Sequence, residues 1–267
     1  MIDIVLTNYN RETLIVRAIK SIFNQTYKNI HLIIVDDCST DNSVKVIEDL
    51  LNSETYSTKV TFIKNKVNVG AGVSRGIGIK YLKGKYMTFL DSDDYLQEDF
   101  IENMVSYIKG GYDIITHNVL IEIGGSILER EDTQDIDLSN DKFRIITHCE
   151  ILNGSLFKNK LWKKVKYSQR RYLEDTPTFF KLIFFAKKII HTKLQGYVYT
   201  QNSSDSLCKK AKENNIRESL YKLVTLVDEY DFLLQNKGYK LAAIFNKKLN
   251  SILESDNPLE LLSNINK

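Results

Sequence analysis

Three carboxylates lie where a short apolar segment of the chain ends. The segment Tyr86 to Leu90 is apolar and partly aromatic, which is typical of a buried strand, and Asp91, Asp93 and Asp94 follow it directly. Open α/β sheets bind ligands at the carboxyl ends of their strands. Mg²⁺ and Mn²⁺ prefer oxygen ligands and keep positions for water and phosphate. The pattern predicts a divalent metal completed by a diphosphate; the alternative is a solvated helix N-terminus, where Asp is also favoured.

A second acidic pair favours the metal interpretation. Asp36-Asp37 ends the apolar segment Ile30 to Val35. In a parallel sheet the two acidic ends face the same edge. A nucleotide bound there would have its base and ribose near Asp37 and its diphosphate on a metal at Asp93.

The elements that must position these acids alternate between strand and helix from residue 2 to about residue 95. Such alternation is typical of a mostly parallel central sheet flanked by helices, and fully apolar strands fit burial on both faces. The first four strands are expected at 2–6, 30–35, 60–63 and 86–90, and the helices between them at about 14–23, 44–51 and 73–81. The later elements are expected as a helix at 98–109, a strand at 113–121, a hairpin turn at 124–125, a helix at 179–186, strands at 189–193 and 197–200, and helices from about 209.

Composition excludes several classes of protein. The 267 residues are 43% apolar, enough for a sizeable core, and the net charge of +3 is too small to favour nucleic acid as a partner. Three cysteines and four histidines are scattered, so neither a disulfide framework nor a zinc site is expected. Because the sequence has no membrane-spanning apolar run and no basic leader, a cytoplasmic location is expected.

The order of five short motifs resembles glycosyltransferase family 2, a group of nucleotide-sugar transferases with the GT-A fold. In chain order these motifs are Leu6-Thr7-Asn8-Tyr9-Asn10, Val35-Asp36-Asp37-Cys38-Ser39-Thr40-Asp41, Asn68-Val69-Gly70 with Ser74-Arg75, Leu90-Asp91-Ser92-Asp93-Asp94, and Glu174-Asp175. They cover residues 1 to about 200. The resemblance implies a GT-A domain at 1–205, with a nucleotide-sugar half at about 1–95 and an acceptor half at about 96–205, followed by a helical tail at 206–267.

The resemblance also implies a role for individual residues. Seven of them would bind the nucleotide-sugar: Thr7, Tyr9, Asp37, Asn68, Arg75, Asp91 and Ser92. Asp93 would hold Mn²⁺ or Mg²⁺, Asp175 would be the catalytic base, and Glu174 would lie beside it. Two positions depart from the common family pattern, because Cys38 replaces a Gly after the Asp pair and Gly76 replaces an Asn after the Arg.

The implied reaction is a metal-dependent, inverting transfer of a hexose or N-acetylhexosamine. The donor would be a UDP-sugar, and the acceptor a hydroxyl of a cell-envelope glycan, a teichoic acid or a lipid-linked acceptor. The cation neutralises the leaving diphosphate and a carboxylate takes the acceptor proton. The alternatives are a catalytically silent binding or assembly module, and a sugar-nucleotide pyrophosphorylase. The latter would want a Gly-rich basic loop where this chain has Asn8-Tyr9-Asn10-Arg11.

For two further stretches the sequence allows two interpretations each. The basic residues between Lys158 and Arg171 are either the solvated face of a helix or a surface that attracts an anionic acceptor or phospholipid, which would place the protein at the inner face of the membrane. The apolar stripes of the C-terminal helices either pack on the main domain or associate with a second copy.

Overall fold

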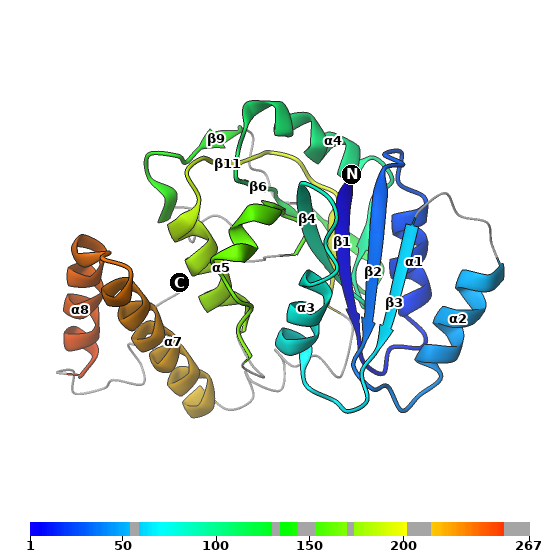
Figure 1. Cartoon of the computed structure of the whole chain (residues 1–267), viewed down its shortest axis with the longest axis horizontal. Coiled ribbons are helices and arrows are strands. Elements are labelled where there is room, and N and C mark those ends of the chain that lie inside the picture. The colour runs from blue at the N-terminus through cyan, green and yellow to red at the C-terminus, as the bar shows by residue number, and fades with distance from the viewer. Residues whose placement is uncertain (54–58, 130–133, 144–152, 170–173, 202–214, 254–267) are drawn as a thin grey trace.

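The computed structural model describes residues 1–53, 59–129, 134–143, 153–169, 174–201 and 215–253, and, within the last range, the side chains of 224–247 and 250. Helices lie on both faces of a central sheet, and the C-terminal helices form a lobe at one end of the molecule (Figure 1). None of the helices in these ranges has the length and apolarity to cross a membrane.

The central sheet has eight strands in the order β3-β2-β1-β4-β10-β6-β11-β9. The strand bounds are β1 Ile2–Asn8, β2 Ile30–Asp36, β3 Lys59–Lys64, β4 Tyr86–Asp91, β6 Ile114–Thr116, β9 Ile136–Asp137, β10 Leu156–Lys158 and β11 Ile189–His191. Strands β1 to β4 are parallel, whereas β10 is antiparallel to both of its neighbours and β9 is antiparallel to β11. The predicted α/β fold with a mostly parallel sheet is therefore confirmed.

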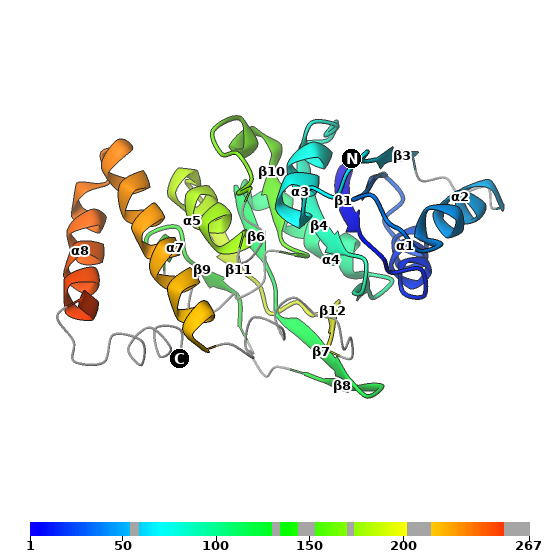
Figure 2. The same ribbon diagram turned by 90° about the horizontal axis from the view of Figure 1, so that it is seen from below.

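A second, four-stranded sheet lies below the first in the order β5-β12-β7-β8 (Figure 2). Its strands are β5 Tyr95–Leu96, β7 Val119–Ile123, β8 Ser126–Leu128 and β12 Tyr197–Thr200. The expected single strand at 113–121 is wrong, because the chain leaves the large sheet after Thr116 and enters the small one at Val119. The hairpin turn at 124–125 is confirmed, since β7 and β8 pair antiparallel across it.

Two apolar cores lie on opposite faces of the large sheet. One packs β1, β2 and β4 against the first, second and fourth helices, and the other packs the same three strands against the third and fifth. The helix bounds are α1 Ile15–Phe23, α2 Ser43–Ser53, α3 Ala71–Ile79, α4 Phe100–Ser106, α5 Asp175–Phe185, α7 Asn215–Gln235 and α8 Tyr239–Leu253, with 3-10 turns η1 Tyr107–Gly110 and η3 Asn159–Lys163. Burial on both faces explains why β2 is wholly apolar up to Asp36 except for His31.

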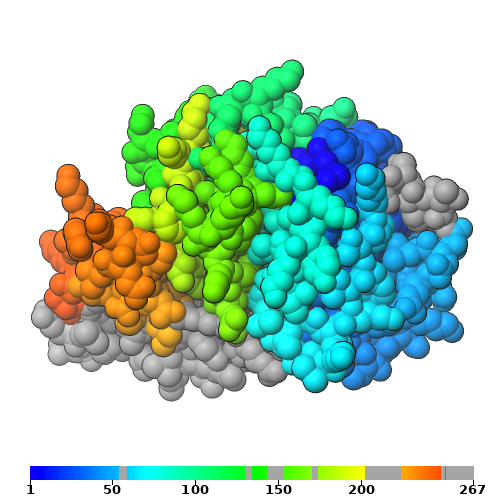
Figure 3. Space-filling view, viewed as in Figure 1, coloured from blue at the N-terminus to red at the C-terminus, as the bar shows by residue number. Residues whose placement is uncertain are grey.

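The C-terminal helices pack within the chain. Phe232 of α7 makes edge contacts with Phe180, Phe184 and Phe185 of α5. Figure 3 shows the orange C-terminal lobe against the yellow-green surface of the main domain, and in Figure 1 α7 lies between α5 and α8. Association with a second copy stays a prediction. Asn257 and Pro258, whose order in the sequence favours the start of a last short helix, lie outside the described residues.

The basic stretch does not form one regular helix. Its described part begins with Lys158 at the end of β10 and continues into the 3-10 turn η3. Lys158 and Lys160 each place their Nζ 2.9 Å from Asp113 Oδ1. Lys163, Lys164 and Lys166 are exposed, and Arg170 and Arg171 lie outside the described residues. Phospholipid contact at this stretch stays a prediction.

Candidate active site

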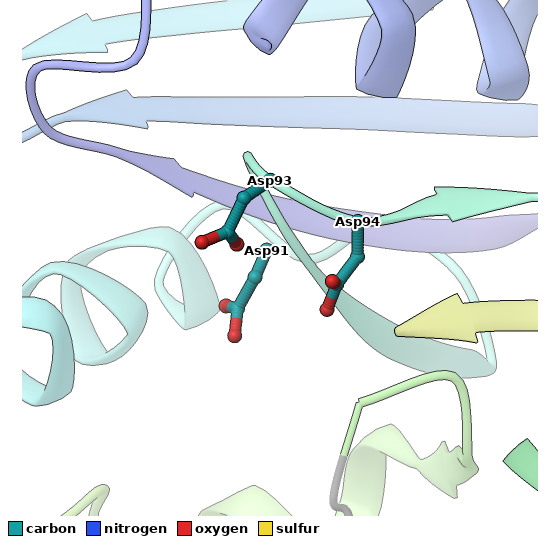
Figure 4. Close-up of side chains that lie close together, drawn as sticks. All are labelled: Asp91, Asp93 and Asp94. Carbon is teal, nitrogen blue, oxygen red and sulfur yellow. The ribbon is translucent and has the colours of Figure 1, made fainter. Parts of the chain in front are cut away.

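The acidic turn lies at the carboxyl end of β4, as predicted. Asp91 ends the strand, Ser92 is buried in the turn, and one carboxylate oxygen from each of Asp91, Asp93 and Asp94 lies within 4.8 Å of the others. Figure 4 shows Asp91 and Asp93 directed to the same open side, whereas Asp94 lies beside β12. The three acids therefore have different surroundings.

Asp91 is held from both sides. Its Oδ1 accepts a hydrogen bond of 2.6 Å from Arg75 Nη2, and its Oδ2 accepts one of 2.7 Å from Asn153 Nδ2. The side chain keeps 30% of its surface exposed, so its orientation is fixed while one side stays accessible.

Both carboxylate oxygens of Asp94 accept hydrogen bonds from within the protein. Tyr197 donates its hydroxyl hydrogen to Oδ2, and the main-chain N–H of Thr200 donates to Oδ1 at 2.9 Å. Burial, together with the neighbouring charges of Asp91 and Asp93, raises the pKa of Asp94 well above its usual range. Because both oxygens face β12, Asp94 joins the turn to the small sheet and is not the acid that faces a ligand.

Asp93 is the acid of the turn with the weakest contacts to the rest of the protein. Its Oδ2 lies 3.7 Å from Arg11 Nε, and 24% of its side chain is exposed. Burial and the charge of Asp91 raise the pKa of Asp93, although Arg11 opposes the shift. A carboxylate destabilised in this way gains from a cation, and exposed oxygen ligands suit Mg²⁺ or Mn²⁺. The residues present therefore fit a divalent metal.

Arg75 connects the acidic turn to Glu174. The residue is only 6% exposed, and besides Asp91 its guanidinium contacts Glu174 Oε1 and the Tyr167 hydroxyl, the latter at 3.1 Å. Burial opposes the charge, but Asp91, Tyr167 and Glu174 raise the pKa of Arg75 well above its usual value. Burial also raises the pKa of Glu174, whereas Arg75 lowers it.

Helix α5 begins at the predicted acidic pair. Glu174 precedes the helix and Asp175 is its first residue. Asp175 is half-buried, and its Oδ1 accepts a 2.8 Å hydrogen bond from the N–H of Thr176. A Cβ at Gly72 would clash with the main-chain oxygen of Ser168 and with Glu174 Cγ, so this glycine lets the segment before α5 approach α3.

Asp37 organises the neighbouring loop. Its carboxylate accepts hydrogen bonds from the N–H groups of Val69 and Gly70, at 2.9 and 2.7 Å, and from Asn65 Nδ2 at 2.8 Å. Asn68 donates its side-chain amide to the main-chain oxygen of Asp37 at 3.3 Å. The structure thus brings Asp37 and Asn68 together, and the Asp37 carboxylate accepts hydrogen bonds from the loop that leads into α3.

The end of β1 completes this edge of the sheet. Thr7 lies opposite Asp91 on one side and Val35 on the other, and the following Tyr9 is 44% exposed. Cys38 has a φ of +64°, a left-handed conformation that favours Gly. This geometry gives a physical reason for the Gly that the family commonly has here. At Gly76 an added Cβ would make only ordinary contact with Tyr167, so a side chain fits.

Sequence reasoning missed several residues that hold the site. Arg11 and Asn153 contact the acidic turn, and Tyr167 contacts Arg75. Asn153 and Gly154 form a turn-like pair shortly before β10, which begins at Leu156, and this pair was the available signal; Gly154 has a φ of +82°. Arg11 follows the recognised first motif and was the easiest of the three to find.

Comparison with known proteins agrees with this geometry. The chain is 31% identical over 55% of its length to an uncharacterized glycosyltransferase of Haemophilus influenzae. It is 27% identical over 82% of its length to the minor teichoic acid biosynthesis protein GgaB of Bacillus subtilis. It spans only 60% and 25% of the lengths of these two relatives.

Solved structures share the fold. S. aureus TarS 1-349 in complex with UDP-GlcNAc matches with a TM-score of 0.71 and 19% identity, covering 85% of this chain and 66% of that one. The mannosyltransferase PcManGT of Pyrobaculum calidifontis, in complex with GDP-Man and Mn²⁺, matches with a TM-score of 0.67 and 14% identity, covering 98% and 72%. The expected GT-A architecture is confirmed by these neighbours.

The family model for glycosyl transferase family 2 matches residues 3–181, which include the acidic turn, the Asp37 loop and the Glu174-Asp175 pair. The chain belongs to glycosyltransferase family 2.

Proposed function

We propose that this chain transfers a hexose or N-acetylhexosamine from a UDP-sugar to a hydroxyl group of a cell-envelope glycan, a teichoic acid or a lipid-linked acceptor. The observation that carries the proposal is the connected set of acids at one sheet edge. Asp93 is partly exposed and loosely paired, Asp91 is fixed beside it, and Arg75 joins Asp91 to Glu174. The relative GgaB and the TarS complex support the acceptor and donor classes respectively.

The donor would lie along the carboxyl ends of β1, β2 and β4. Asp37 and Asn68 fix the loop at one end of this edge, where the uridine would bind beside Thr7 and Tyr9. Asp91 and Asp93 would face the diphosphate at the other end. Mn²⁺ or Mg²⁺, held by Asp93, would supply Lewis-acid neutralisation of the leaving diphosphate.

Asp175 is the proposed base. Arg75 pairs with Glu174, which leaves the Asp175 carboxylate at the start of α5 to accept the acceptor's hydroxyl proton. The acceptor oxygen forms a bond to the anomeric carbon as the bond from that carbon to the diphosphate oxygen breaks. The bonding electron pair leaves with UDP, and attack opposite the leaving group inverts the anomeric centre.

The experiment that tests the donor is UDP or GDP release from a panel of UDP-sugars and GDP-mannose, with Mn²⁺ and with chelator. Slow hydrolysis of one UDP-sugar, abolished by chelator, is expected. Hydrolysis of GDP-mannose alone would overturn the donor class. If the protein neither hydrolyses a donor nor binds UDP, the result would favour a catalytically silent module.

The base is tested separately. Asp175→Asn is expected to abolish transfer while UDP affinity stays within about twofold of the wild type, because Asp175 does not touch the nucleotide in this proposal. Transfer that survives in Asp175→Asn would show that the base is another residue.

A further inference from the structure

Arg17 of α1 lies where the two sheets meet, and it contacts both of them. Its Nη2 donates to the main-chain oxygen of Asp93 at 2.9 Å and to Thr200 Oγ1 at 2.8 Å, and its Nη1 donates to Glu122 Oε2 at 2.9 Å. The guanidinium carbon also lies 4.4 Å from the centre of the Tyr95 ring. One side chain therefore hydrogen-bonds to the acidic turn, β7 and β12, and makes a cation–π contact with β5.

The partners of Arg17 also bond to one another. Thr200 lies opposite Glu122 in the parallel pair β7–β12, and its Oγ1 lies 3.1 Å from Glu122 Oε2. The N–H of Thr200 donates to Asp94. The peptide between Asp93 and Asp94 is thus fixed on both sides, by Arg17 at the oxygen of Asp93 and by β12 at the carboxylate of Asp94.

We propose that Arg17 is a positioning residue for the metal site, which fixes the direction of the Asp93 carboxylate by holding its main-chain oxygen against the small sheet. This inference rests on the proposed function. Arg17 does not neutralise the Asp93 carboxylate, since its bond goes to the main chain and its charge is matched by Glu122. Its effect is geometric, because Mg²⁺ and Mn²⁺ tolerate little error in ligand position.

The test compares Arg17→Met with Lys20→Met, an exposed basic residue on the same helix. Mn²⁺ affinity is measured by titration calorimetry in saturating UDP, and UDP affinity is measured in chelator. Loss of a residue that orients a metal ligand typically weakens metal binding ~10- to 100-fold. Arg17→Met is expected to bind Mn²⁺ about tenfold more weakly, with metal-free UDP binding unchanged, and Lys20→Met is expected to match the wild type.

Two milder variants cover the case in which Arg17→Met does not fold. Arg17→Lys keeps the charge but loses the forked geometry, and Glu122→Gln removes the charge that holds the fork. Each is expected to weaken Mn²⁺ binding about threefold. Mn²⁺ affinity equal to the wild type in folded Arg17 variants would overturn the inference. A wild type without Mn²⁺-dependent UDP binding would instead overturn the proposed function.

Discussion

The large sheet carries acids at both ends of its strands, but the two sets of acids differ in how fully they are paired. At the amino end of β1, Asp3 is fully buried and accepts hydrogen bonds from the N–H groups of Lys83 and Gly84 and from Asn159 Nδ2, while Oδ1 lies 2.9 Å from His31 Nδ1. At the carboxyl edge, Asp93 has a loose ion pair and an exposed side.

This difference separates acids whose hydrogen-bonding capacity the protein fills from acids that stay accessible to a ligand. A buried carboxylate whose lone pairs are filled by the protein has no capacity left for a cation, and removing it leaves donors without a partner. A carboxylate that is desolvated but poorly paired destabilises the empty protein and gains when a cation arrives. Asp3 and Asp113 belong to the first kind, and Asp93 belongs to the second.

The largest expected effect comes from Asp93→Asn. Donor hydrolysis should fall by about a thousandfold, because the metal loses its charged ligand. Because burial and the neighbouring charge of Asp91 raise the pKa of Asp93, its charge is unfavourable in the fold, and the apo protein should become more stable to urea at pH 7. Activity assays and urea unfolding measure the two effects, with exposed Asp99→Asn as the control. An Asp93→Asn protein that is less stable than the wild type but fully active would show that Asp93 stabilises the fold and does not hold a metal.

At the opposite edge, Asp3→Asn should cost about 3 kcal/mol in unfolding free energy. The new amide would place hydrogens against the N–H groups of Lys83 or Gly84, which now donate to the carboxylate. Urea unfolding of Asp3→Asn beside Asp49→Asn, an exposed acid of α2, measures the cost. A cost no larger than that of the control would mean that the filled hydrogen bonds of Asp3 do not stabilise the fold.

Asp113→Asn should cost about 2 kcal/mol at pH 7. Although burial opposes the shift, hydrogen bonds from Lys160, Lys158 and the N–H of Lys187 lower the pKa of Asp113 well below its usual value. The folded-state pKa is below the unfolded value of about 3.9, so this stability is present above that pH and is lost as the pH falls through the folded-state pKa. Urea unfolding at pH 7 and pH 3 should show the difference between wild type and variant shrinking. A constant difference would assign the effect to packing.

Much of the carboxyl edge was predictable because its acids directly follow apolar strands. Asp37, Asp91 and Asp93 could be placed from strand ends alone, and Glu174-Asp175 from the resemblance. The strands at 30–36, 86–91 and 197–200 were found for the same reason, since buried parallel strands are continuous apolar runs.

The residues that hold those acids could not be placed, because their partners are far away in sequence. Arg17 and Glu122 are separated by 105 residues, and Asn153 and Asp91 by 62. Local patterns also missed the break after Thr116, since an apolar run shows burial but not the sheet in which a strand lies. Local sequence therefore indicates which acids lie at a strand end, whereas the residues that orient those acids are brought to them only by the assembled fold.

The smallest expected effect concerns backbone strain at the carboxyl edge. Cys38 holds a φ of +64°, where a Cβ costs roughly 1–2 kcal/mol, and Gly removes that cost but loses ~0.4–1 kcal/mol to the freer unfolded chain. Cys38→Gly should therefore gain about 0.5 kcal/mol in unfolding free energy. Cys38→Ala, which keeps the Cβ and removes the thiol, should show no gain. An equal gain in both variants would trace the effect to the thiol, whose Sγ lies 3.6 Å from the oxygen of Lys66. Backbone strain at Cys38 would then not lower the stability of the carboxyl edge.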